Sequence, residues 1–304
     1  MVTTVAPGAR ARRRSTRGTS RAGFLFALPF LVVFLAMLVL PLGYAAYLSL
    51  FREQLVGGNS FVGLDNYIRA VQDPDLRDGV LRVARFFLIQ VPLMLALSLF
   101  FALALDSGRL RFPRLFRLGI FVPYAVPSVV AALMWGYFYG RDFGPIGQTF
   151  AHLGLTLPDL LSSGLVLPSL ANIVTWAFTG YNMIILYAAL RAVPAELYEA
   201  AAVDGAGPWR TAWSIKIPAI RPALLLTVIF SVIGSFQLFN EPKLLMTIAP
   251  DVISSSYTAN LYAYTLAFTG QQVNYAATVS FLLGLVIVIV SYAVLLTANR
   301  RRTS

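Results

Sequence analysis

Six stretches of about 20 or more residues without a charged side chain constrain this chain more than any other feature. A helix needs roughly 20 apolar residues to cross the hydrocarbon core of a bilayer, which is about 30 Å thick. The 304 residues are 58% hydrophobic and only 12% charged, whereas soluble domains carry about 25% charged residues. We therefore predict an all-α membrane protein with six transmembrane helices, at 24–51, 84–106, 118–140, 165–190, 222–245 and 275–298.

Basic residues are concentrated in alternate connections between these stretches. Residues 1–23 hold six arginines, and further basic residues lie within 109–117, 191–221 and 300–302. Because basic loops are retained in the cytoplasm, both termini and the 191–221 loop are predicted to be cytoplasmic. Residues 1–23 are predicted to be a disordered basic tail, and 24–298 the transmembrane domain. The net charge of +11 then reflects topology and contact with membrane lipid, and no nucleic-acid partner is expected.

The composition excludes several kinds of chemistry. There is no cysteine and a single histidine, so neither a cysteine site nor a multi-histidine metal site is expected. Neither lysine follows a glycine, which excludes a GxxxxGK[ST] phosphate-binding loop. No charged residue lies in the middle of a predicted span, which argues against a carrier driven by protons or sodium. No catalytic or metal-binding residue is predicted.

The 191–221 loop, which separates the fourth and fifth predicted spans, is the most informative segment. Pro194 suits the first turn of a short helix, and acidic residues at 196 and 199 favour the N-terminal half of that helix. Gly205 and Gly207 are expected to end it, and Pro208 to begin a second helix. Such a short amphipathic helix suits either docking into a partner's groove or lying on the lipid surface.

The loop resembles the EAA loop of ABC importer permeases. The matching residues are Glu199, Ala200, Ala201, Asp204, Gly205, Ile215 and Pro218. Ile217 stands where the motif usually has leucine. Segments 116–135, 192–206, 236–247 and 263–268 resemble the maltose-type carbohydrate permeases, so the likeness extends over nearly the whole chain. Residues 245–251 depart from that family, which often has a glycine-rich stretch there.

The resemblance implies a permease subunit rather than an enzyme. The partners would be a second homologous permease, two ATPase subunits and an extracytoplasmic solute-binding protein, in the inner membrane of a prokaryote. The loop would couple this chain to an ATPase subunit, with Glu199 pairing to a basic residue there and Gly205 allowing a sharp turn. No cofactor is expected in this chain, because ATP and Mg²⁺ would bind to the ATPase.

A polar stripe on the fourth predicted span is a candidate wall of the substrate path. Asn172, Thr175, Thr179 and Asn182 are spaced three, four and three apart, and Trp176 flanks them. This spacing places the four on one face of a helix. The stripe either faces a lumen or forms hydrogen bonds between helices. Tyr181 lies off the stripe, but its position corresponds to a substrate-contacting tyrosine in the maltose-type family.

The fifth predicted span contributes the second set of candidates. Ser231, Ser235, Gln237 and Asn240 lie in the region where the resemblance places the sugar contacts. Glu241 and Lys243 are expected at the outer rim, where they meet the binding protein or each other.

Import of a di- or oligosaccharide is the leading hypothesis. A glycerophosphodiester or polyol importer of the same class, and a secondary carrier that uses no nucleotide, stay as alternatives.

Overall fold

The computed structural model describes residues 19–54 and 58–300, which form two units divided between Leu48 and Ser49. Helices make up most of the described chain, and one short hairpin is the sheet found among the described residues. The predicted all-α class is therefore confirmed. The orientation of the termini stays a prediction.

The first unit is a single apolar helical segment. It contains α1 (Thr19–Phe34), a π-helical turn η1 (Leu35–Val39) and most of α2 (Leu40–Ser49). Pro41 has no N–H, and its ring would clash with the carbonyl four residues earlier in a regular helix. The wider turn just before it accommodates this ring. Helix α1 begins at Thr19, inside the predicted disordered tail, and residues 1–18 of that tail lie outside the described residues.

The second unit begins with a hairpin and continues as helices. Strands β1 (Phe51–Gln54) and β2 (Gly58–Phe61) are antiparallel, with Phe51 opposite Phe61. The first group of helices is α3 (Asp65–Gln72), α4 (Pro74–Asp106), α5 (Pro113–Ala125), α6 (Ser128–Phe138), α7 (Pro145–His152) and α8 (Val166–Arg191). The second group is α9 (Ala195–Val203), α10 (Pro208–Thr211), the π-helical turn η2 (Ala212–Lys216), α11 (Ile217–Ala219), α12 (Arg221–Phe236), α13 (Asn240–Leu245), α14 (Ala259–Phe268) and α15 (Val273–Arg300).

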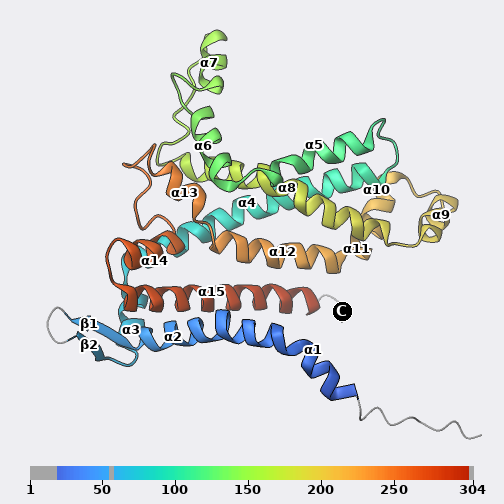
Figure 1. Ribbon diagram of the computed structural model, residues 1–304. Coiled ribbons are helices and arrows are strands. Elements are labelled where there is room, and N and C mark those ends of the chain that lie inside the picture. Colours follow the sequence, from blue (N-terminus) through green and yellow to red (C-terminus); the bar gives the residue numbers. More distant parts are fainter. Residues whose placement is uncertain (1–18, 55–57, 301–304) are drawn as a thin grey trace, which may run out of the picture. The chain divides into compact units, whose positions relative to one another are not determined.

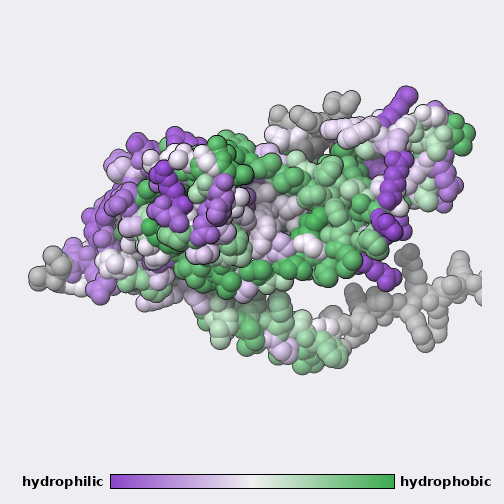
Figure 2. Space-filling view, turned by 90° about the horizontal axis from the view of Figure 1, so that it is seen from above, coloured by the Kyte–Doolittle hydropathy of each residue, from purple (hydrophilic) through white to green (hydrophobic). Residues whose placement is uncertain are grey.

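Four long helices, α4, α8, α12 and α15, lie side by side in the second unit (Figure 1). Near one end, α4 packs on α8 through Ala102, Leu105 and Leu186. Figure 2 shows hydrophobic side chains over the middle of this unit and hydrophilic ones gathered at its ends. Large apolar side chains also face outward, including Leu88, which is 68% exposed, and Val288, which is 62% exposed. A soluble protein rarely exposes so much apolar surface, whereas lipid covers such side chains in a membrane.

Five described helical segments are long and apolar enough to cross a membrane. They are Gly23–Ser49, Pro74–Asp106, Val166–Arg191, Arg221–Leu245 and Val273–Thr297. A sixth apolar segment consists of α5 and α6, which meet at an angle of 98°. The predicted span 118–140 is therefore not one straight helix. The second segment begins ten residues before the predicted position 84, because Asp73 caps α4 and Pro74 occupies its first turn.

Candidate functional site

Two of the apolar segments are interrupted close to one another. Between α5 and α6, Val126 has an extended backbone, as expected for a residue that precedes a proline. Between α12 and α13 the helix is broken over residues 237–239. The two breaks are joined by a hydrogen bond of 2.8 Å from the Asn240 side-chain amide to the Ser128 hydroxyl. Breaks at membrane depth are tolerated only where protein or a water-filled cavity satisfies the freed backbone groups.

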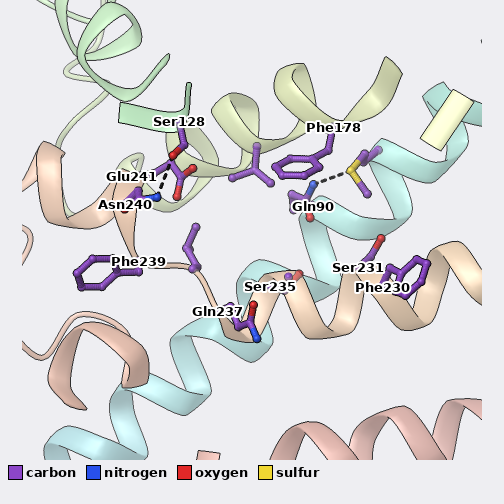
Figure 3. A pocket seen from close by; sticks show the side chains of 14 residues that line it. Gln90, Ser128, Phe178, Phe230, Ser231, Ser235, Gln237, Phe239, Asn240 and Glu241 are labelled. Atoms are coloured by element: carbon purple, nitrogen blue, oxygen red, sulfur yellow. Dashed lines mark hydrogen bonds between the residues drawn. The ribbon is translucent and has the colours of Figure 1, made fainter. Parts of the chain in front are cut away.

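A cavity of about 310 Å³ lies at these breaks, between α4, α8 and α12 (Figure 3). Its wall consists of Gln90, Met94, Ser128, Val174, Phe178, Phe230, Ser231, Gly234, Ser235, Gln237, Leu238, Phe239, Asn240 and Glu241. A second hollow of about 350 Å³, at the α5–α6 break, shares Ser128, Phe178 and Glu241 with it. Together the two hollows form one candidate solute site, which we call the breakpoint cavity.

The wall combines hydroxyl and amide groups with phenyl rings. Gln90 is only 1% exposed, and its side-chain N–H lies 3.2 Å from the Met94 sulfur, a weak acceptor. Ser231 donates to the carbonyl of Thr227, so its oxygen still has capacity to accept. Hydroxyls and amides of this kind recognise neutral polar solutes, and phenyl rings cover the apolar faces of such solutes.

Glu241 is the single charged residue among the described residues that line the breakpoint cavity. The sequence pattern predicts Glu241 at the outer rim, where it meets the binding protein or pairs with Lys243. The pairing does not form, because the Lys243 ammonium lies 5.1 Å from the Tyr264 ring centroid and Glu241 makes no ion pair with any described residue. The bend of the chain at 237–239 turns Glu241 toward the cavity, which the sequence pattern does not reveal.

The structure places the four candidates from the fifth predicted span on this wall. Ser231 and Ser235 belong to α12, Gln237 lies in the break, and Asn240 begins α13. Gln237 and Asn240 are exposed, while Ser235 is 5% exposed. Whether they contact a solute stays a prediction.

The candidates on α8 do not line the breakpoint cavity. The Asn172 amide donates to the Tyr139 hydroxyl at 2.9 Å, and Thr179 donates to the backbone of Thr175 at 2.6 Å. Asn182 is buried, and its N–H groups reach Phe178 O and the Met94 sulfur. Trp176 packs edge-on against Trp135, and Tyr181 stacks on Tyr124 with ring centroids 4.8 Å apart. Asn172 and Asn182 therefore favour the alternative in which the stripe bonds helices together, whereas Thr179 bonds within α8.

Sequence reasoning missed several cavity residues. Helix α8 contributes Val174 and Phe178, which lie between the members of the polar stripe. Phe178 resembles any other apolar residue in a span, so no sequence signal marks it. Gln90 could have been recognised from the sequence. Placing an amide in an otherwise apolar span costs free energy, so such a residue usually indicates a function.

The 191–221 loop forms the predicted pair of short helices, α9 and α10. Gly205 has φ +75°, the left-handed conformation that favours glycine. The N–H of Ala206 donates to Ala201 O, and that of Gly205 donates to Ala202 O. This pair of bonds is the Schellman arrangement, which ends a helix by satisfying its last carbonyls. The expected sharp turn at Gly205 is therefore confirmed.

The candidate coupling residues differ in exposure. Glu199, Ala200 and Asp204 are exposed, Ala201 is buried, and Ile215 and Pro218 are half-buried. Large apolar side chains of the loop also point outward, with Val203 88%, Trp209 76% and Trp213 66% exposed. The loop thus presents a mixed surface of carboxylates and large apolar groups. Within residues 19–54 and 58–300, no cluster of histidine and acidic side chains is arranged to hold a metal ion.

Comparisons with known proteins agree with this architecture. Residues 9–304 match the family described as binding-protein-dependent transport system inner membrane component. The lactose transport system permease protein LacF of Rhizobium radiobacter is 31% identical over 288 residues, which cover 92% of this chain and 95% of that protein. The diacetylchitobiose uptake system permease protein NgcF of Streptomyces coelicolor is 30% identical, over 96% of this chain and 86% of that protein.

A solved structure shares the fold. It is a chain from the bacterial alginate ABC transporter in complex with alginate pentasaccharide-bound periplasmic protein, with a TM-score of 0.78 at 19% identity. The match covers 95% of this chain and 96% of that one. From the family match and the apolar helices, this chain belongs to the multi-pass inner membrane components of binding-protein-dependent transport systems.

Proposed function

We propose that this chain is one permease subunit of an ATP-binding cassette importer. With a second, homologous permease it forms the path for an uncharged di- or oligosaccharide, which an extracytoplasmic binding protein delivers. The observation that carries the proposal is the breakpoint cavity, where two interrupted apolar segments meet. In secondary transporters, interrupted helices at membrane depth typically form the solute site, and we extend that reasoning to this chain.

The chemistry of the wall supports a sugar. Serine hydroxyls and the amides of Gln90, Gln237 and Asn240 match the donors and acceptors of a ring of hydroxyl groups. The rings of Phe178, Phe230 and Phe239 provide apolar surface for the flat faces of a pyranose. The names of the relatives, which refer to lactose and diacetylchitobiose, support the same class.

The charge of the wall supports an uncharged solute over the glycerophosphodiester alternative. Glu241 contributes a carboxylate, and none of the described residues that line the breakpoint cavity is basic. A phosphate or carboxylate of the solute would therefore meet repulsion without a compensating ion pair. A polyol shares the chemistry of a sugar and is separated from it by the uptake experiment below.

The exposed loop supports a separate ATPase subunit, which would bind the ATP and Mg²⁺. Apolar groups such as Trp209 and Trp213 are costly to expose to water, and a partner's groove would cover them. Glu199, exposed on α9, offers a carboxylate to a basic residue of that partner. The nucleotide-independent carrier alternative gives such a surface no role.

Filling the cavity tests the proposal. Gly234 lines the cavity, and a Cβ built there meets no atom within 4 Å, so Gly234→Leu adds bulk without a backbone clash. We expect this variant to reduce uptake at least tenfold in cells that lack the native chain. The measurement is uptake of radiolabelled lactose, diacetylchitobiose, other neutral sugars, glycerol and glycerol 3-phosphate, with and without depletion of ATP.

The matched control is Gly284→Leu on α15, where a Cβ also meets no atom within 4 Å but which lies outside the cavity wall. It is expected to retain normal uptake. Uptake that requires this chain but survives depletion of ATP would contradict an ATP-driven importer. Equal losses in the two variants would contradict the cavity as the path.

A further inference from the structure

An ion pair joins the 191–221 loop to the end of α4. The Lys216 ammonium, in η2, donates to the Asp106 carboxylate, at the last residue of α4. The two side chains are 15% and 4% exposed. Only one other ion pair occurs among the described residues, Arg77–Asp78, and its side chains are 68% and 60% exposed. The Lys216–Asp106 pair is therefore the more deeply buried of the two.

Helix α9 contacts the same ion pair. The Lys216 ammonium lies 4.8 Å from the centroid of the Tyr198 ring, which belongs to α9. Burial and the nearby charge of Asp106 raise the pKa of Tyr198, while Arg191 lowers it. The Tyr198 hydroxyl also donates to Leu190 O, near the end of α8, at 3.4 Å. One ammonium thus contacts both the candidate coupling helix and α4.

The pair lies beside a hollow between the loop and α4. Tyr198, Asp106 and Lys216 line a hollow of about 690 Å³, whose wall also includes Trp209 and Arg109. On this side the ion pair bridges the loop and α4 across the edge of the hollow. A buried ion pair adds little net stability, because desolvation offsets the attraction, but it fixes the geometry of the groups that it joins.

Helix α4 leads from this pair to the breakpoint cavity. It is continuous from Pro74 to Asp106, and Gln90 and Met94 on it line the cavity. Met94 lies twelve residues before Asp106, which corresponds to about 18 Å along a helix. A displacement imposed on Asp106 would therefore reach the cavity wall through one unbroken helix.

We propose that Lys216 and Asp106 are positioning residues that transmit movement of the 191–221 loop to α4, and through α4 to the breakpoint cavity. This proposal rests on the proposed function, because it requires an ATPase that moves the loop. The pair sets how much solute is carried per ATP hydrolysed, and it does not bind solute or nucleotide. A purely structural pair would affect assembly and thermal stability but leave that ratio unchanged.

The test uses the complete transporter in proteoliposomes, with its binding protein and the solute identified by the uptake experiment. The variants are Asp106→Asn, Lys216→Met and the exchange Asp106→Lys with Lys216→Asp. The readout is ATP hydrolysed per solute imported. We expect each single variant to raise this ratio at least fivefold and the exchange to bring it within twofold of the wild type. The control is Asp78→Asn, which breaks the exposed pair on the same helix and should leave the ratio unchanged.

A double-cysteine variant covers the case in which the single substitutions fail to assemble or the exchanged side chains cannot form the ion pair. The chain has no cysteine, so Asp106→Cys with Lys216→Cys introduces a unique pair. A short bis-methanethiosulfonate reagent that links this pair should restore a ratio that is raised in the unlinked protein.

Single variants that assemble with a wild-type ratio would overturn the proposal, as would a linked pair that stays as uncoupled as the unlinked one. Failure of the wild-type complex to import solute with ATP would instead contradict the proposed function itself.

Discussion

At the scale of single residues, Asp73 connects three helices. Its carboxylate accepts from the backbone N–H of Asp75 and Leu76 at the start of α4. It also accepts from the hydroxyls of Tyr262 on α14, at 2.8 Å, and Tyr275 on α15, at 2.6 Å. Burial opposes its ionisation, but the hydrogen bonds outweigh burial and lower its pKa. Asp73 thus stabilises the folded state in its charged form.

The lowered pKa gives a prediction with a definite sign. The stabilisation is present above the unfolded pKa, about 3.9, and is lost as the pH falls through the lower folded value. Tyr275→Phe removes one hydrogen bond and should lower the free energy of unfolding by about 1 kcal/mol near pH 7. The expected loss is no larger because the site is partly exposed to solvent. The measurement is the thermal midpoint of the purified protein at pH 7 and near pH 3, where the loss should shrink. Tyr292→Phe, on the exposed face of α15, is the control; an equal loss at both pH values would contradict the role of Asp73.

At the scale of elements, α5 and α8 approach closely at Gly180. A Cβ built at this glycine would overlap the carbonyl oxygen of Ile120 and lie 2.7 Å from the Cα of Phe121. Small residues permit such contacts between membrane helices, where packing rather than the hydrophobic effect drives association. This contact fixes α5 just before its break and so helps to position the breakpoint cavity.

Gly180→Ala is therefore expected to destabilise the protein by about 1–3 kcal/mol, the usual cost of overpacking. Although alanine favours a helix more than glycine does, the clash with backbone atoms should outweigh that gain. Gly119→Ala on α5, where a Cβ meets no atom within 4 Å, is the matched control and should be neutral or slightly stabilising. Thermal midpoints in detergent measure both variants. A Gly180→Ala variant as stable as the control would contradict the close approach.

At the scale of the whole molecule, the segments that join the apolar helices fall into two groups that differ in charge. One group is basic and includes segments 107–112 and 191–221, and the other, which includes segment 139–165, is less basic. The uneven distribution of arginine and lysine predicts that the first group is cytoplasmic.

Labelling tests this orientation, because the native chain has no cysteine. Phe112→Cys and Leu155→Cys place single thiols at residues that are 62% and 56% exposed. A membrane-impermeant maleimide applied to intact spheroplasts should label the thiol at 155 at once and the thiol at 112 only after permeabilisation. The reverse order would contradict the cytoplasmic position of the coupling loop.

The sequence alone determined the fold class, the number of apolar segments and the turn at Gly205. These follow from local chemistry, because a bilayer requires about 20 apolar residues per helix and a left-handed turn favours glycine. The family is also determined by the sequence, because the chain matches known permeases over most of its length. The polar candidates of α12 and α13 could also be named from the sequence, because the resemblance to carbohydrate permeases places sugar contacts in that region.

Only the tertiary structure decided which polar groups face the cavity. The α8 stripe has suitable spacing, yet its members lie outside the cavity wall: Asn172 bonds to Tyr139 at the end of α6, and Asn182 contacts Met94 on α4. Glu241 and Gln90 reach the cavity because two helices break and a third passes beside them. Whether a polar side chain faces the cavity or another helix depends on the residues packed against it. Those residues are far apart from it in the sequence, so local patterns do not reveal them.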